Sequence, residues 1–258
     1  MGKIVSIASQ KGGTGKTVST YTMGLELSKR GLRVLLVDID PQANLTFLSG
    51  VNELISDKSI TDVFINKVKM KDIIVQVKNG AIKENFYLVP SSIALFSIEN
   101  ILNGVEDKEY ILKKALYSVK EEYDVILIDC PPTSVILQTN ALTSSDYVII
   151  PSEASYLSNR YLQFMEDIIF TVKENFNKDL KLYGILITQF EEDLQSKKIL
   201  DELQDKYDII GIIPNDEDKI IYSLSDSEIR VAPDSEFATA YKNTTNKIYE
   251  DILHAKIH

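Results

Sequence analysis

Short apolar runs alternate with longer segments of helical period along most of this chain. The runs are continuous stretches of Ile, Val and Leu, which is typical of strands buried on both faces of a parallel sheet. Strands are predicted at Ile4–Ala8, Arg33–Asp38, Phe86–Val89, Tyr123–Asp129, Tyr147–Ile150, Leu182–Thr188 and Ile209–Ile213. Helices are predicted at Lys16–Arg30, Lys108–Glu122, Ser134–Thr143, Ser158–Asn175, Leu194–Tyr207 and Phe237–His254. This alternation predicts an α/β fold with helices on both faces of a twisted, mainly parallel sheet.

The chain shows no obvious division into parts. No shift in composition, Pro/Gly/Ser-rich linker or internal repeat interrupts its 258 residues, so we predict one domain over residues 1–258. The polar stretch Asn52–Asn85 is the least patterned, and we expect short helices there that leave the sheet.

Composition limits the class of protein. A hydrophobic content of 44% with 26% charged residues suits a globular chain with a sizeable core, and no apolar run reaches the ~18 residues of a membrane span. The single cysteine, Cys130, excludes a disulfide framework and predicts a cytoplasmic protein. The formal net charge of −10 gives no general attraction to nucleic acid or to anionic lipid, so such binding needs a local basic patch or one made by dimerisation.

Candidate chemistry begins at Ser9–Thr20, "SQKGGTGKTVST", between the first strand and the first helix. The glycines let the backbone curl around phosphate oxygens, Lys16 can reach the β- and γ-phosphates, and the Thr17 hydroxyl suits Mg²⁺. The ordinary pattern G-x-x-x-x-G-K-[ST] fails here, because Gln10 replaces its first glycine and an extra lysine, Lys11, follows.

Aspartates end two further predicted strands. Asp38 and Asp40 lie in "VDIDPQ", and Asp129 lies in "IDCPP". Ligands of parallel sheets gather at the carboxyl ends of the strands, so these carboxylates are candidates for a site near the phosphates and Mg²⁺. Each aspartate could instead cap a turn.

These motifs, with "NAL" at Asn140–Leu142 and "IIP" at Ile212–Pro214, resemble the ParA/MinD family of deviant Walker ATPases, and most of all its ParA-type (Soj-like) partition proteins. The order and spacing of the motifs match that family over nearly the whole chain. The resemblance implies a P-loop NTPase fold with ATP and Mg²⁺ as cofactors.

The resemblance also implies roles for individual residues. Lys11 is expected to cross to the partner's phosphates in a dimer that encloses two ATP molecules, and Asp40 to position the water for hydrolysis. The implied catalytic residues are Lys11, Lys16 and Asp40, and the implied metal residues are Thr17, Asp38 and Asp129. The implied nucleotide-binding residues are Lys11, Gly12, Gly13, Thr14, Gly15, Lys16, Thr17, Val18, Pro214, Asn215 and Asp216, the last three against the adenine.

The function implied is that of a weak Mg²⁺-dependent ATPase that becomes a homodimer on binding ATP. Such a dimer binds DNA non-specifically, associates with the nucleoid and is released when a ParB-like or other partner stimulates hydrolysis. The alternative is a ParA-like switch that positions a protein cargo or septum regulator without contacting DNA. Stable membrane association is not expected, because Glu250 and Asp251 interrupt the apolar residues of the terminal "KIYEDILHAKIH".

The chain departs from the family at three places. Val18 stands where Thr or Ser is usual, which keeps the backbone N–H but removes a hydroxyl from the α-phosphate. The segment "IPNDEDKII" is acidic where the family is often basic. The segment "SEASYLSNRYLQF" lacks the usual "AL-x-G", and its Arg160 is either functional or simply exposed. The candidate DNA contacts are Lys219, Arg230, Lys242 and Lys247, unless these are ordinary solvated residues.

Overall fold

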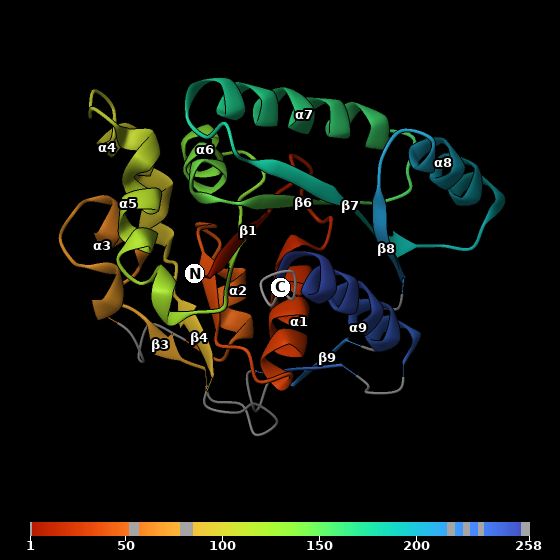
Figure 1. Cartoon of the computed structure of the whole chain (residues 1–258), viewed down its shortest axis with the longest axis horizontal. Helices are drawn as coiled ribbons and strands as arrows, with labels where there is room; N and C mark the ends of the chain where they lie inside the picture. Colours follow the sequence, from red (N-terminus) through yellow and green to blue (C-terminus); the bar gives the residue numbers. More distant parts are fainter. Residues whose placement is uncertain are drawn as a thin grey trace.

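The computed structural model describes residues 2–51, 57–77, 85–215, 220–223, 228–231 and 235–253, with the backbone alone for 220–223 and 228–231. Within these residues the main sheet has eight strands, in the order β3-β4-β2-β5-β1-β6-β7-β8 (Figure 1). The strands are β1 (Lys3–Ile7), β2 (Val34–Asp38), β3 (Val75–Gln76), β4 (Phe86–Val89), β5 (Val125–Asp129), β6 (Tyr147–Ser152), β7 (Lys181–Phe190) and β8 (Ile209–Pro214). All neighbouring pairs are parallel except β3 with β4. A separate antiparallel pair joins β9 (Ile220–Ser223) and β10 (Glu228–Val231).

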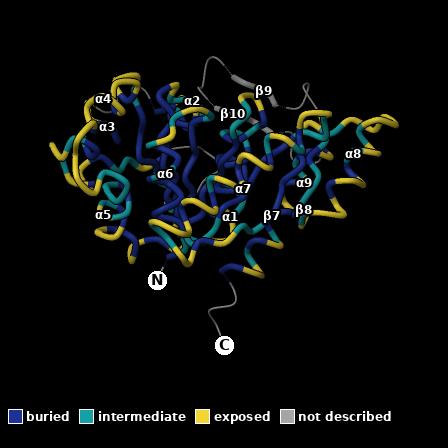
Figure 2. Tube along the Cα trace, turned by 90° about the horizontal axis from the view of Figure 1, so that it is seen from above, coloured by how far each residue is buried: buried dark blue, intermediate teal, exposed yellow. Residues whose placement is uncertain are grey.

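Helices cover both faces of the main sheet, as the alternating pattern predicts. They are α1 (Lys16–Lys29), α2 (Asn44–Leu48), α3 (Ile60–Phe64), α4 (Ile98–Ile101), α5 (Ile111–Tyr117), α6 (Val135–Ser144), α7 (Ser158–Asn175), α8 (Leu194–Gln204) and α9 (Glu236–Ile248). Helices α1 and α9 pack side by side on one face, and α5, α6 and α7 lie on the other (Figure 1). The strands are buried between two apolar layers, while the outer sides of the helices are exposed (Figure 2). No helix among the described residues is long and apolar enough to cross a membrane.

The central strands are continuous apolar runs for a physical reason. Every residue of β2 and of β5 is buried, because helices cover both faces of these strands. The register pairs Ile7 and Asp38 with Asp129 across neighbouring strands, so the carboxyl ends of β1, β2 and β5 lie together. That edge positions the candidate site.

One predicted helix is wrong. The structure divides Lys108–Glu122 into a 3₁₀ turn at Lys108–Tyr110, helix α5 and a second 3₁₀ turn at Lys120–Glu122. The cause is a buried side chain from α6: Asn140 donates to the carbonyl of Lys108 at 2.9 Å and accepts from the amide of Leu112 at 3.0 Å. These bonds take the place of the backbone bonds that a continuous helix would make.

Other differences concern short elements. Of the predicted terminal helix Phe237–His254, the α-helical part ends at Ile248, and a π-helical turn follows at Tyr249–Leu253. His254 lies outside the described residues. The weakly patterned stretch Asn52–Asn85 contains α3, a 3₁₀ turn and β3 within its described part, which confirms short helical structure but adds an edge strand. Helices α2 and α4 and the paired strands β9 and β10 were not predicted.

Substitution of Asn140 is expected to destabilise the fold. Asn140→Ala removes three hydrogen bonds from a fully buried side chain, since its amide also donates to the carbonyl of Ile136. The buried backbone groups left without partners should lower the free energy of unfolding by about 2–3 kcal/mol in urea titrations. Asn175→Ala is the matched control, because that exposed amide bonds only the carbonyl of Thr171. Equal stability of the two variants would contradict the role of Asn140.

Candidate nucleotide and magnesium site

The loop between β1 and α1 has the backbone of a phosphate-binding turn. Gly13 and Gly15 have φ angles of 76° and 73°, in the left-handed region that favours glycine. Helix α1 begins directly at Lys16, and its N-cap Gly15 has no side chain to occupy the first amides. The N–H groups of this turn therefore remain available for an anion at the positive end of the helix.

The ammonium groups of both lysines in the loop contact other groups of the same chain. Lys16 is only 6% exposed and donates to the carbonyl of Lys11 at 3.0 Å. Burial lowers the pKa of Lys16, and the charge of Asp129 opposes that shift. Lys11 points to another element, where its Nζ lies 2.5 Å from a carboxylate oxygen of Glu153.

A cavity of about 500 Å³ opens over this loop. It is lined by Gly12, Gly13, Thr14, Gly15, Lys16, Thr17, Val18, Asp40, Gln42, Asn44, Pro132, Thr188, Gln189, Ile213, Pro214, Asn215, Phe237 and Tyr241. Most of the residues predicted to bind nucleotide are thus gathered at one cavity. Lys11 belongs to the same loop but is absent from the lining, and Asp216 lies outside the described residues.

Several lining residues were missed by sequence reasoning. Thr188 donates to the carbonyl of Thr14 at 3.0 Å and Gln189 to that of Gly13 at 2.5 Å, so the end of β7 holds the phosphate loop. Their position at the carboxyl end of a buried strand could have indicated them. Phe237 and Tyr241 come from α9, and Tyr241 shares a hydrogen bond with Ser19 at 2.9 Å. Nothing in the local sequence indicates that α9 reaches the cavity.

Asp38 and Asp129 are completely buried beside each other and do not line the cavity. Burial raises the pKa of Asp38 to about 7, although Thr46 and the amide of Asp40 donate hydrogen bonds that favour its ionised form. Burial also raises the pKa of Asp129 well above its ordinary value, and the charge of Asp38 adds to this. Two such carboxylates on adjacent strands need nearby positive charge in order to ionise.

The donor set fits Mg²⁺ at Thr17 and Asp129. Neither carboxylate oxygen of Asp129 accepts a hydrogen bond within the described part of the chain, which leaves a buried acceptor unsatisfied. The hydroxyl of Thr17 lies at the cavity wall, and oxygen donors are what Mg²⁺ prefers. Asp38 fits less well, because both of its oxygens already accept hydrogen bonds from Asp40 and Thr46.

Asp40 lies at the cavity wall on the turn after β2. Its carboxylate accepts from the amide of Gln42 at 2.9 Å, and its carbonyl accepts from the hydroxyl of Ser91 at 2.7 Å. Ala43, further along the turn, has a φ of 53°, which is unfavourable for a residue with a Cβ. The turn that carries Asp40 is therefore held in a specific, strained conformation.

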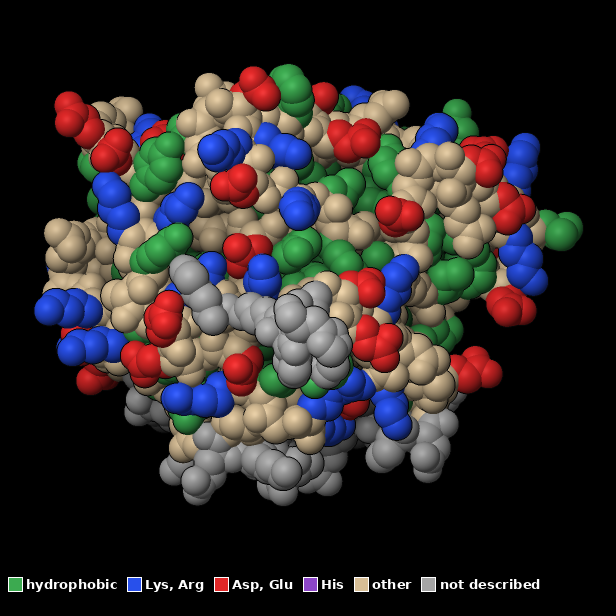
Figure 3. All heavy atoms as spheres, in the orientation of Figure 1, with side chains coloured by type: hydrophobic (Ala, Val, Ile, Leu, Met, Phe, Trp, Pro, Cys, Tyr) green, Lys and Arg blue, Asp and Glu red, His purple; other side chains and the backbone are tan. Residues whose placement is uncertain are grey.

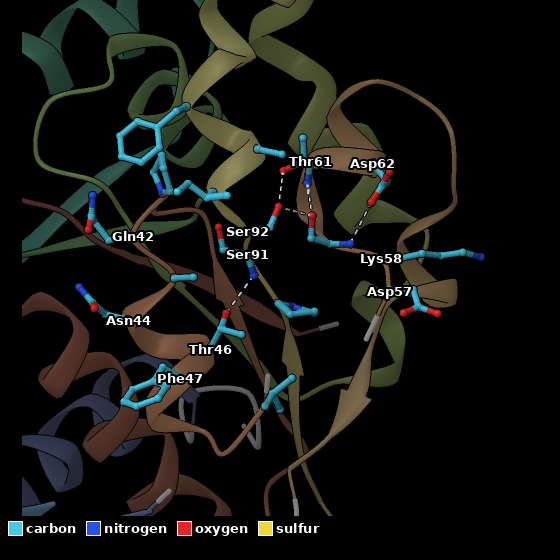
Figure 4. A pocket seen from close by; sticks show the side chains of 18 of the residues that line it. Gln42, Asn44, Thr46, Phe47, Asp57, Lys58, Thr61, Asp62, Ser91 and Ser92 are labelled. Carbon is cyan, nitrogen blue, oxygen red and sulfur yellow. Dashed lines mark hydrogen bonds between the residues drawn. The ribbon is translucent and has the colours of Figure 1, made fainter. Parts of the chain in front are cut away.

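A second cleft of about 840 Å³ adjoins the first and shares Gln42 and Asn44 with it. Figure 4 shows it between α2, α3 and the segment after β4. Its floor is polar: Thr46 donates to Asp38 at 2.7 Å and accepts from the amide of Ser91 at 2.9 Å. Exposed apolar side chains also line it, namely Phe47, Ile93 and Phe96.

The candidate DNA contacts are only partly described. Lys242 and Lys247 are exposed on α9, Lys219 lies outside the described residues, and Arg230 is on β10 with its backbone alone described. On the face drawn in Figure 3, Lys and Arg side chains are interspersed with Asp and Glu. Arg160 on α7 stacks over the ring of Phe164, with its guanidinium carbon 5.6 Å from the ring centroid.

Comparisons with known proteins agree with this geometry. A family described as AAA domain matches residues 2–182. The sporulation initiation inhibitor protein Soj of Bacillus subtilis is 38% identical over 191 residues, which cover 74% of each chain. This chain belongs to the ParA/MinD family. Its P-loop α/β fold is that of this family's partition ATPases.

Solved structures show the same fold over nearly the whole chain. A plasmid partition protein from Borrelia burgdorferi is 27% identical, with a TM-score of 0.78 over 97% of this chain and 99% of the other. A cobyrinic acid a,c-diamide synthase from Mycobacterium smegmatis, with a bound ATP analogue and magnesium, is 30% identical, with a TM-score of 0.82 over 97% of each chain. The fold of the ParA/MinD family thus extends beyond the residues that the family description matches.

Removal of the Thr46 hydroxyl should destabilise the protein more at high pH. The folded-state pKa of Asp38, about 7, exceeds its ordinary value of 3.8, so the contribution of Asp38 to stability is lost as pH rises to about 7. Thr46 favours the ionised form, and Thr46→Val should therefore cost about 1 kcal/mol at pH 6 and about 2–3 kcal/mol at pH 8, measured by urea denaturation without Mg²⁺. Thr171→Val, at an exposed hydroxyl that bonds the carbonyl of Asp167, is the control. A cost independent of pH would contradict this assignment.

Proposed function

We propose that this chain is an ATPase that forms a dimer around two ATP molecules, binds DNA non-specifically and is released after hydrolysis stimulated by a partner protein. The observation that supports this most directly is that Lys16 and Thr17, at the end of the loop that carries Lys11, line one cavity with Asp40 from the turn after β2. The whole chain, residues 1–258, acts as one domain in this proposal. It operates in the cytoplasm and associates with the nucleoid when ATP is bound.

The roles of the site residues follow from their positions. Lys16 and the amides of the loop bind the phosphates, and Pro214 and Asn215, which also line the cavity, contact the adenine. Mg²⁺, bound through Thr17 with Asp129 as an outer partner, supplies charge stabilisation to the phosphoryl group. Asp40 orients the attacking water. Val18 lines the cavity and keeps its backbone N–H, so the missing hydroxyl is expected to cost only about 1 kcal/mol of binding.

Dimerisation explains why the loop carries two lysines. ATP brings about four negative charges into an interface with little water, where charge-assisted contacts are strong. Lys16 offsets charge on its own nucleotide, and Lys11 of each copy offsets charge on the nucleotide of the other.

Substitution of Lys16 should abolish nucleotide binding. Lys16→Ala removes the buried cation of the loop and is expected to weaken ATP binding by about two orders of magnitude, which corresponds to roughly 3 kcal/mol. Titration calorimetry with a non-hydrolysable ATP analogue and Mg²⁺ measures this. Lys29→Ala, at the exposed end of the same helix, should leave the affinity unchanged. Normal binding by Lys16→Ala would overturn the nucleotide site.

Substitution of Asp40 should trap the ATP-bound dimer and expose its affinity for DNA. Asp40→Ala with ATP and Mg²⁺ is expected to remain dimeric in light scattering, because the hydrolytic water is no longer oriented. The trapped dimer should be retained on random-sequence duplex DNA at 50 mM salt, with an affinity that falls at least about tenfold by 200 mM.

The outcomes separate the two candidate functions. Unchanged turnover in Asp40→Ala would remove its catalytic role. A trapped dimer that is not retained on DNA even at low salt would favour a switch that positions a protein cargo. The net charge of −10 supports this alternative, because it gives the chain no general attraction to DNA.

A further inference from the structure

The ion pair between Lys11 and Glu153 connects two neighbouring strands of the sheet. Lys11 is on the loop after β1, and Glu153 directly follows β6, which pairs with β1. The distance from Nζ to Oε2 is 2.5 Å, and the two side chains are only 28% and 26% exposed. A pair sheltered to this extent is screened less by salt than an exposed one.

The backbone on both sides of the pair is fixed. The carbonyl of Glu153 accepts from the hydroxyls of Ser152 and Ser158. The carbonyl of Lys11 accepts from Thr14 at 3.3 Å and from the ammonium of Lys16 at 3.0 Å. Hydrogen bonds to the backbone therefore fix both segments that carry the pair. The side chains of Lys11 and Glu153 start from fixed positions close to each other.

We propose that Glu153 is a positioning residue, which holds Lys11 within its own chain until nucleotide binds. The inference rests on the proposed function, in which Lys11 reaches the nucleotide of a second copy. A lysine bound to Glu153 is unavailable for that contact, so each subunit has to release its pair before the dimer closes. Glu153 thereby opposes dimerisation in the absence of ATP.

Lys16 links the release to the subunit's own nucleotide. In the structure the ammonium of Lys16 donates to the carbonyl of Lys11. ATP draws Lys16 to its phosphates, which removes that bond and loosens the backbone of Lys11. Nucleotide binding then weakens one of the two anchors of the ion pair, so ATP and Glu153 act in opposite directions on the same lysine.

A zero-length carbodiimide cross-link tests the pair directly in the full chain. Such a reagent joins a carboxylate and an amine only when they are in contact. In nucleotide-free protein, mass spectrometry should find Lys11 linked to Glu153. In an equal mixture of ¹⁴N- and ¹⁵N-labelled protein the linked peptides should carry a single label, as expected for a pair within one chain. A non-hydrolysable ATP analogue with Mg²⁺ should reduce this cross-link at least about fivefold.

The dimer equilibrium tests the consequence. Two pairs are released in each dimer, so a factor of about 2 to 5 for each pair becomes about 4- to 25-fold in the dissociation constant. Glu153→Gln should tighten the analogue-bound dimer by that factor in analytical ultracentrifugation, while Glu153→Asp, which keeps the charge, should stay closer to the wild type. Glu192→Gln is the matched control, because its pair with Lys197 spans 3.6 Å at an exposed site.

Each outcome supports or overturns the proposal. The proposal is overturned if Glu153→Gln leaves the dissociation constant of the dimer unchanged or raises it. A raised dissociation constant together with cross-links of mixed label would show that Glu153 pairs with the lysine of the other copy. A wild-type protein that binds the analogue but stays monomeric removes the dimer of the proposed function. In that case, loss of the Lys11–Glu153 cross-link on addition of the analogue would still support release of Lys11 by nucleotide. A cross-link that persists with the analogue would overturn that release.

Discussion

The site depends on the burial of like charges at one edge of the sheet. Asp38 and Asp129 end adjacent parallel strands in register and are removed from water by helices on both faces. Asp38 is compensated locally by Thr46 and by the amide of Asp40. Neither oxygen of Asp129 has a well-formed hydrogen bond among the described residues, and the neighbouring Thr17 hydroxyl and the charge of Lys16 favour its ionised form. A buried carboxylate that ionises without a partner costs several kcal/mol, so Asp129 is either protonated or ionised beside a cation.

The same constraint explains the state of the phosphate loop. In the structure the ammonium of Lys16 donates to the carbonyl of Lys11, and Lys11 pairs with Glu153. Both cations of the loop are thus held by groups of the chain. Under the proposed function, phosphate contacts would replace these contacts, and only the difference between the two sets would contribute to affinity.

The sequence predicts the site better than it predicts the elements around it. Strands buried on both faces leave continuous apolar runs, and Asp40 was found because parallel strands collect ligands at their carboxyl ends. Thr17 was found from the Gly-Lys-Thr pattern of the phosphate loop. The break in the predicted helix at Lys108–Glu122 could not be found, because Asn140 belongs to another element. Tyr241 was missed for the same reason, since a distant helix brings it to the cavity.

The turn that carries Asp40 connects the nucleotide cavity to the second cleft. Gln42 and Asn44 line both, and Ser91 on the floor of the cleft donates to the carbonyl of Asp40. The left-handed backbone of Ala43 costs about 1–2 kcal/mol, and this is sustained by the bonds around it. Ser91 and Thr46 therefore join the turn that carries Asp40 to the floor of the second cleft through one set of hydrogen bonds.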